Sequence, residues 1–133
     1  VANVDSLIIV ASLRNPMPDL GFIDKMLVIA KAKNVEVTIC FNKTDLDESL
    51  ANELAEIYAE SECKIVCTSA ACGIGIEEIR NDAFKNCGNL IIYFEGTKNK
   101  YDNDYAYRLC REVCTPTFLL SFYFDFCNLN NFF

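Results

Sequence analysis

Four consecutive residues, Asn42-Lys43-Thr44-Asp45, follow an apolar run that ends at Phe41. Guanine presents two neighbouring donors, its N1–H and its 2-amino group, and one carboxylate such as that of Asp45 can accept both. Adenine lacks the 2-amino group and has an acceptor at the first position. Binding adenine would therefore leave a desolvated carboxylate unpaired, a penalty on the order of a few kcal/mol. The tetrapeptide predicts a site that reads guanine.

The other two side chains of this tetrapeptide have expected roles as well. Asn42 is predicted to brace neighbouring loops and to reach the edge of the base, and the aliphatic stem of Lys43 is predicted to cover a face of the ring. The alternative is a solvated turn that closes a strand. That alternative is the better interpretation when a four-residue match stands alone.

A second segment, Thr68-Ser69-Ala70, comes one expected helix and one expected strand later. Its backbone N–H groups are predicted to donate to guanine O6, with Ser69 and Ala70 completing the base pocket. Taken alone, these residues would be an ordinary strand-to-helix loop. The spacing between the two segments is what favours nucleotide recognition.

The elements that must position these loops alternate between strands and helices. Strands are expected at about 5–13, 35–41, 63–68 and 89–94, and helices from Asp19 to near Asn34, from about Asp47 to Ser61 and from Ile76 to Phe84. The expected core-facing residues of the first two helices are Phe22, Met26, Ile29, Ala30, Leu50, Leu54, Ile57 and Tyr58.

This order predicts an α/β fold, a three-layer, mostly parallel sheet of the P-loop-NTPase type. Ligands of such sheets bind beyond the carboxyl ends of the strands, so the loops at 42–45, 68–72 and 95–102 are expected at one edge. Residues 105–113 are compatible with a further helix. The aromatic-rich run 118–124 is either one more core strand or a sequence foreign to the fold.

Composition and charge exclude several classes of protein. The chain has 133 residues, 52% hydrophobic and 23% charged, with a net charge of −7 and no basic stripe, so any RNA contact is expected to depend on segments outside it. It has eight cysteines but no histidine and no CxxC pair, which favours reduced, buried cysteines over zinc or disulfides. No apolar run is long enough for a membrane span, and a cytoplasmic location is the expectation.

The chain resembles the ribosome small-subunit-dependent GTPases of the RsgA or YjeQ type over about residues 1–95. The resembling segments are the opening residues 1–5, Leu20 to Val28, Phe41 to Leu46 and Thr68 to Ile76. In that family the base-reading motifs precede the phosphate loop, by circular permutation. The resemblance implies GTP or GDP as ligand, Mg²⁺ as cofactor, the small ribosomal subunit and its rRNA as partners, and GTP hydrolysis as activity.

The chain departs from the family pattern after residue 95. No G-x-x-x-x-G-K-[ST] motif lies ahead of Asn42. If Gly96 began one downstream, Tyr101, Asp102 and Asn103 would stand where glycine, lysine and serine or threonine belong. The family's oligonucleotide-binding barrel and zinc domain are also not visible here. We therefore expect a partial, truncated GTPase domain at 1–95 and a diverged tail at 96–133.

The resulting hypothesis is guanine-nucleotide binding by Asn42, Lys43, Asp45, Ser69 and Ala70. Hydrolysis needs a phosphate clamp and a loop hydroxyl on Mg²⁺, and neither is in register, so turnover by this chain is in doubt and no catalytic residue is named. One alternative is a non-enzymatic α/β interaction module, a pseudo-GTPase without nucleotide. Another is a small metal protein that uses the cysteines.

Overall fold

The computed structural model describes residues 5–85 and 90–94. These residues form a sheet of four parallel strands in the order β3-β2-β1-β4. The strands are β1 (Ser6–Ser12), β2 (Glu36–Asn42), β3 (Lys64–Cys67) and β4 (Leu90–Phe94). The helices are α1 (Leu20–Ala32), α2 (Glu48–Tyr58) and α3 (Ile76–Lys85). The predicted alternation of strands and helices is confirmed.

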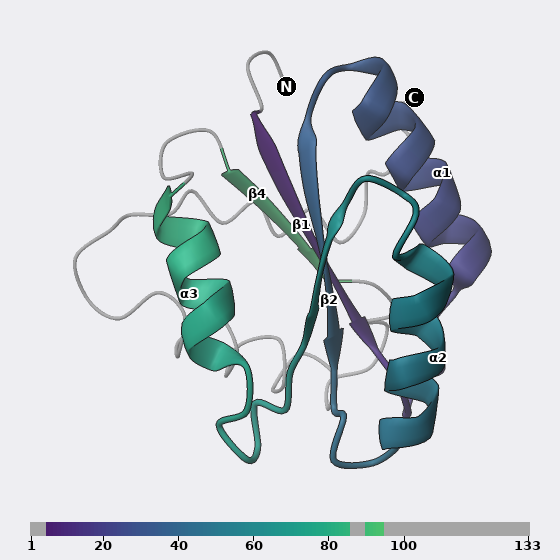
Figure 1. The fold of residues 1–133 in the computed structure, drawn as a ribbon, viewed down its shortest axis with the longest axis vertical. Helices are drawn as coiled ribbons and strands as arrows, with labels where there is room; N and C mark the ends of the chain where they lie inside the picture. Colours follow the sequence, from purple (N-terminus) through teal and green to yellow (C-terminus); the bar gives the residue numbers. More distant parts are fainter. Residues whose placement is uncertain (1–4, 86–89, 95–133) are drawn as a thin grey trace.

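Helices cover both faces of this sheet, as Figure 1 shows: α1 and α2 lie on one side and α3 on the other. The residues of β1 alternate between the two sides because successive side chains of a strand point to opposite faces. Leu7 and Ile9 join the core beneath α1 and α2, whereas Ile8 and Val10 join the core beneath α3. This is the predicted three-layer α/β architecture.

Two aspartates cap the helices that follow β1 and β2. Asp19 accepts a hydrogen bond from the backbone N–H of Phe22 at 3.0 Å, as predicted for the first helix, and Asp47 accepts one from that of Leu50 at 2.9 Å. The bond from Leu50, together with the Arg14 guanidinium beside it, lowers the pKa of Asp47 below its usual range. Both caps start their helices just beyond the loops at the carboxyl edge of the sheet.

The predicted buried faces of α1 and α2 are partly wrong. In α1 the fully buried side chain is Ile23, while the predicted Phe22 and Ile29 are only partly buried. In α2 the predicted Ile57 is 56% exposed. The physical reason is the same in both helices: a helix that lies across a narrow four-stranded sheet buries one stripe, and each of these residues lies at the border of that stripe.

Tyr58 links α2 to α1 through its hydroxyl group, which donates to Asp24 Oδ1 at 2.8 Å while the ring packs against Phe41. Tyr58→Phe keeps the ring and removes this bond, so we expect the free energy of unfolding to fall by about 1 kcal/mol. Urea denaturation measures the change. The control is Ile57→Ala, one residue earlier and exposed, which should shift stability by no more than about 0.5 kcal/mol. Equal losses in both variants would contradict this account of the α2 face.

None of the helices within residues 5–85 is long and apolar enough to cross a membrane. The predicted helix at 105–113, the aromatic run at 118–124 and the whole of the expected tail 96–133 lie outside the described residues.

Candidate functional site

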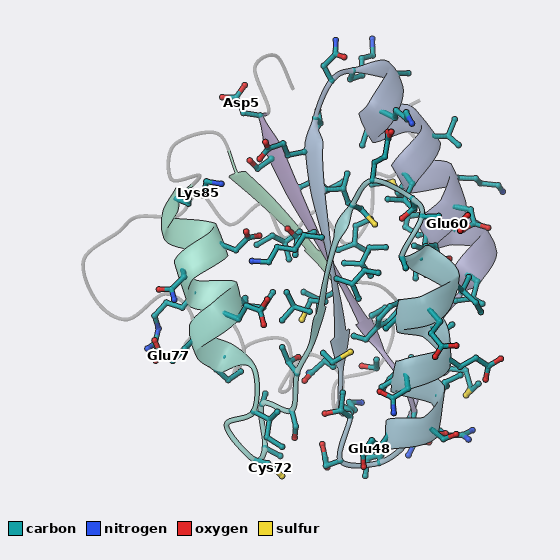
Figure 2. All side chains as sticks on the ribbon, viewed as in Figure 1. Asp5, Glu48, Glu60, Cys72, Glu77 and Lys85 are labelled. Atoms are coloured by element: carbon teal, nitrogen blue, oxygen red, sulfur yellow. The ribbon has the colours of Figure 1, made fainter. Side chains whose placement is uncertain are left out.

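The loops that follow β2 and β3 are joined where the two strands end. The backbone N–H of Thr68 donates to Phe41 O at 2.8 Å, and the backbone N–H of Thr44 donates to Thr68 O at 3.1 Å. The Thr44 hydroxyl adds a bond to the same oxygen at 3.0 Å. Figure 2 places Cys72, in the loop after β3, and Glu48, the first residue of α2, at the same end of the molecule. Two of the three predicted loops therefore share one edge, and the third, 95–102, lies outside the described residues.

The side chain of Asp45 reaches across to the neighbouring loop. Its Oδ1 accepts a hydrogen bond from the Ser69 hydroxyl at 2.5 Å, and Ser69 is fully buried whereas Asp45 is exposed. A carboxylate offers about four lone-pair sites, so one bond from Ser69 leaves acceptor capacity on both oxygens. The buried Ser69 hydroxyl therefore fixes the direction of the exposed Asp45 carboxylate, which can accept further hydrogen bonds.

Asn42, the last residue of β2, is 3% exposed. Its Oδ1 accepts two hydrogen bonds, from the Thr68 hydroxyl at 3.1 Å and from the backbone N–H of Ala70 at 3.2 Å. A backbone N–H can only donate, so the amide atom that faces it must be the oxygen. Within the described part of the chain the Nδ2 group has no hydrogen-bond partner. This buried group can therefore donate to a water molecule or to a ligand.

The backbone N–H groups of residues 68–70, which are predicted to donate to guanine O6, all have acceptors inside the protein. They donate to Phe41 O, to Ile74 O and to Asn42 Oδ1, respectively, so each already has an acceptor inside the protein. That they donate to guanine O6 stays a prediction. The loop turns back on itself through the paired bonds of Ser69 and Ile74, which a plain strand-to-helix loop would not form.

Lys43 is buried, with 6% of its surface exposed, and its backbone has a positive φ of 65°. Its ammonium group donates to Asn15 O at 2.5 Å and to Arg14 O at 3.3 Å. The aliphatic stem therefore runs from the end of β2 to the loop after β1, along the carboxyl edge of the sheet. Its ammonium group has protein acceptors, so the stem rather than the charge is the part that a base would contact.

The loop after β1 is a part of the site that sequence reasoning missed. Besides receiving Lys43, it contains Arg14, whose guanidinium pairs with Asp47 at the start of α2. A signal was present in the sequence, because Pro16 and Pro18 follow the carboxyl end of a buried strand. Loops at the carboxyl ends of parallel strands are where ligands of such sheets bind, so this position marks the loop after β1 as a candidate third wall of the site.

A sequence profile described as RsgA GTPase matches residues 1–92, more than half of the chain. The chain belongs to the RsgA GTPase family. Two relatives named small ribosomal subunit biogenesis GTPase RsgA illustrate the match. The one from Moorella thermoacetica is 38% identical over 80 residues, 60% of this chain and 28% of the relative. The one from Thermotoga petrophila is 44% identical over 84 residues, again 60% and 28%.

A solved member of the RsgA family has the same fold. The crystal structure of YjeQ from Thermotoga maritima superposes with a TM-score of 0.66 at 33% sequence identity, over 89% of this chain and 40% of that one. The expected resemblance and the P-loop-like α/β fold are thus confirmed. The chain spans only about 28% of the length of these curated relatives. The residues that match the family profile, 1–92, include the loops after β2 and β3.

One buried thiol supports the site in this RsgA-family chain and makes its stability depend on pH. Burial raises the pKa of Cys40 from 9.0 to about 12. Because the folded pKa lies above the unfolded one, the stabilisation is complete below pH 9 and is lost as pH rises towards 12. At pH 10 we expect the free energy of unfolding to be about 1.4 kcal/mol lower than at pH 8 on account of this group.

Cys40→Ser is the matched control, because a serine hydroxyl keeps a donor at this position and does not titrate in this range. Urea denaturation at pH 8, 9 and 10 should show a smaller decline in the variant than in the wild type. The same decline in both proteins would show that Cys40 is not its source.

Proposed function

We propose that this chain binds the guanine base of GTP and GDP through the loops that follow β2 and β3. The observation that carries this function is the bond between Asp45 and Ser69, because it joins the two base-reading loops and directs a carboxylate to the surface. The two Asp45 oxygens accept the N1–H and the 2-amino group of guanine. Adenine offers no such pair of donors, so the pocket selects against it.

Asn42 and Lys43 complete the recognition of the base. The Nδ2 group of Asn42 donates to the acceptor edge of guanine, which carries N7 and O6. The stem of Lys43 lies against one face of the ring, held there by the bonds from its ammonium group to Asn15 O and Arg14 O. Ser69 orients Asp45, and the N–H of Ala70 orients Asn42, so both act through another side chain.

The phosphates lie beyond β4 in this proposal. β4 pairs with β1 in the sheet, so its carboxyl end opens on the same edge as the base-reading loops. We propose that residues 1–95 are a circularly permuted GTPase domain and that residues 96–133 depart from it. No catalytic residue and no Mg²⁺ ligand is assigned, and the described residues contain no group of three side chains placed to hold a metal.

The wider role follows from the names of the relatives. Two proteins called small ribosomal subunit biogenesis GTPase RsgA are 38% and 44% identical to this chain over 80 and 84 residues, and we propose that the protein acts with the small ribosomal subunit in the cytoplasm. The net charge of −7 means that contacts with rRNA would come from other segments than this one.

A displacement experiment tests the base-binding step. A fluorescent GDP analogue is titrated with the purified chain, and unlabelled GDP, GTP and ADP compete for it. We expect saturable binding that GDP and GTP reverse and ADP does not, and an upward shift in Tm with excess GDP. Equal competition by ADP, or no saturable binding, would reject the function and favour a non-enzymatic interaction module.

A further inference from the structure

The helices α1 and α2 each present one large apolar residue to solvent. Val28, in the second half of α1, is 69% exposed, and Ile57, near the end of α2, is 56% exposed. Single apolar residues are common on protein surfaces and need no explanation by themselves. What distinguishes these two is the charge of the residues around them, which is opposite in the two helices.

The surface around Val28 is basic. Lys25 and Lys31 lie three residues before and three residues after Val28, so the three exposed side chains share one face of α1. The only acidic residue in the sequence of α1 is Asp24, and its Oδ1 accepts the hydrogen bond from the Tyr58 hydroxyl at 2.8 Å. We call Lys25, Val28 and Lys31 the basic stripe.

The surface around Ile57 is acidic. Glu53 lies one turn before Ile57 on the same face of α2, and Glu60 lies three residues after it, in the turn that follows the helix. All three residues are exposed, and the sequence of α2 contains no basic residue. We call Glu53, Ile57 and Glu60 the acidic stripe. It repeats the pattern of the basic stripe, an apolar residue between two like charges, with the sign reversed.

The two stripes belong to one layer of the molecule, because α1 and α2 cover the same side of the sheet (Figure 1). The bond between Tyr58 and Asp24 joins the two helices, and Lys31 pairs with Glu62 at 2.6 Å. The Lys31 ammonium has three hydrogens, so this pair leaves donors for a further carboxylate. Figure 2 labels Glu60 where the end of α2 lies beside α1. A single partner can therefore approach both stripes.

We propose that this face pairs with the same face of a second copy of the chain, so that the basic stripe of each copy lies against the acidic stripe of the other. A two-fold axis makes such a contact reciprocal: if Val28 of one copy meets Ile57 of the other, the reverse contact follows. Each apolar residue has the same charge on both sides. The lysines therefore meet glutamates whether the paired helices run parallel or antiparallel.

The strength of this pairing follows from its size and charge. The net charge of −7 repels a second copy, but at about 0.15 M salt the Debye length is about 8 Å, so charges in contact outweigh the more distant ones. A contact built on two apolar residues and exposed charges belongs to the small, transient interfaces. We expect a Kd of about 0.1–1 mM, which leaves the chain monomeric at the micromolar concentrations of the urea and displacement assays.

An exchange of charges tests the pairing, with sedimentation velocity at chain concentrations from about 10 µM to about 1 mM. Combining Lys25→Glu with Lys31→Glu makes both stripes acidic, and combining Glu53→Lys with Glu60→Lys makes both basic. Each double variant alone is expected to self-associate at least about tenfold more weakly than the wild type. An equimolar mixture of the two is expected to associate about as tightly as the wild type, because acidic stripes then meet basic ones.

Lys85→Glu is the control, since Lys85 is exposed on α3, across the sheet from this face, and the variant should self-associate as the wild type does. Both double variants keep a net negative charge, so association in their mixture cannot come from overall attraction. A wild type that stays monomeric at the highest concentration would overturn the proposal. So would a mixture that associates no better than its components, or an equal loss in Lys85→Glu. These outcomes leave the proposed guanine binding untouched, because it is carried by other residues.

Discussion

Asp45→Asn is expected to lower the affinity of the chain for GDP by about a hundredfold and to raise its affinity for xanthosine diphosphate. An asparagine amide presents one donor and one acceptor, so it no longer matches the two donors of guanine. It does match xanthine, which keeps N1–H and has an acceptor at position 2. Loss of a charged hydrogen-bond partner is worth about 1.5–3 kcal/mol, and each 1.4 kcal/mol is a factor of ten in affinity.

The displacement assay measures this exchange of specificity with GDP and xanthosine diphosphate as competitors. Asp47→Asn is the matched control: Asp47 lies two residues further on, caps α2 and pairs with Arg14, and asparagine is an equally good cap. The control should bind GDP as the wild type does. A similar loss of GDP affinity in both variants, with no gain for xanthosine diphosphate, would contradict the role given to Asp45.

Gly75→Ala is expected to lower the free energy of unfolding by about 3 kcal/mol and to weaken GDP binding. Gly75 has a φ of +70°, which an alanine adopts only with strain. A Cβ at this position would lie 2.4 Å from Cys67 O and 3.0 Å from Thr68 Cγ2. The loop would have to move away from β3, and with it the bonds between Ile74 and Ser69, so Ser69 would no longer direct Asp45.

Gly73 provides the control for this substitution. Its φ of +71° is nearly the same, but a Cβ there would meet no atom within 4 Å. Gly73→Ala should therefore lose only the conformational part, about 1 kcal/mol, and keep its affinity for GDP. Urea denaturation and the displacement assay give the two quantities. Equal losses in the two variants would mean that contact with Cys67 O does not matter.

The order of strands and helices could be predicted because each buried strand is a continuous apolar run bounded by polar residues or prolines. The start of α1 could be predicted as well, because the side chain of Asp19 is a good N-terminal cap. The exposed position of Ile57 could not be predicted, because apolar spacing fixes the direction of a helix stripe but not its width. The width depends on the size of the sheet beneath, which only the assembled fold reveals.

In the site, the contacts of Asn42 with Ala70 and of Asp45 with Ser69 could be expected from the parallel sheet, which brings successive loops to one edge. The hydrogen-bond partners of Ser69 and Lys43 could not be predicted from the sequence. Ser69 pairs with Ile74 because Gly73 and Gly75 adopt positive φ values and fold the loop back, and this uses the amides that were expected to meet the base. Likewise, Lys43 finds its acceptors in the loop after β1, a contact between residues 28 positions apart that no local pattern encodes.

The most direct test of guanine recognition by these loops is a ¹H–¹⁵N spectrum of the labelled chain during titration with GDP. The side-chain Nδ2 signals of Asn42, assigned with Asn42→Ala, should shift together with the backbone amides of Ser69 and Ala70, and ADP at the same concentration should leave them in place. If GDP shifts only signals from other regions, or if ADP produces the same shifts, the base does not lie between the β2 and β3 loops.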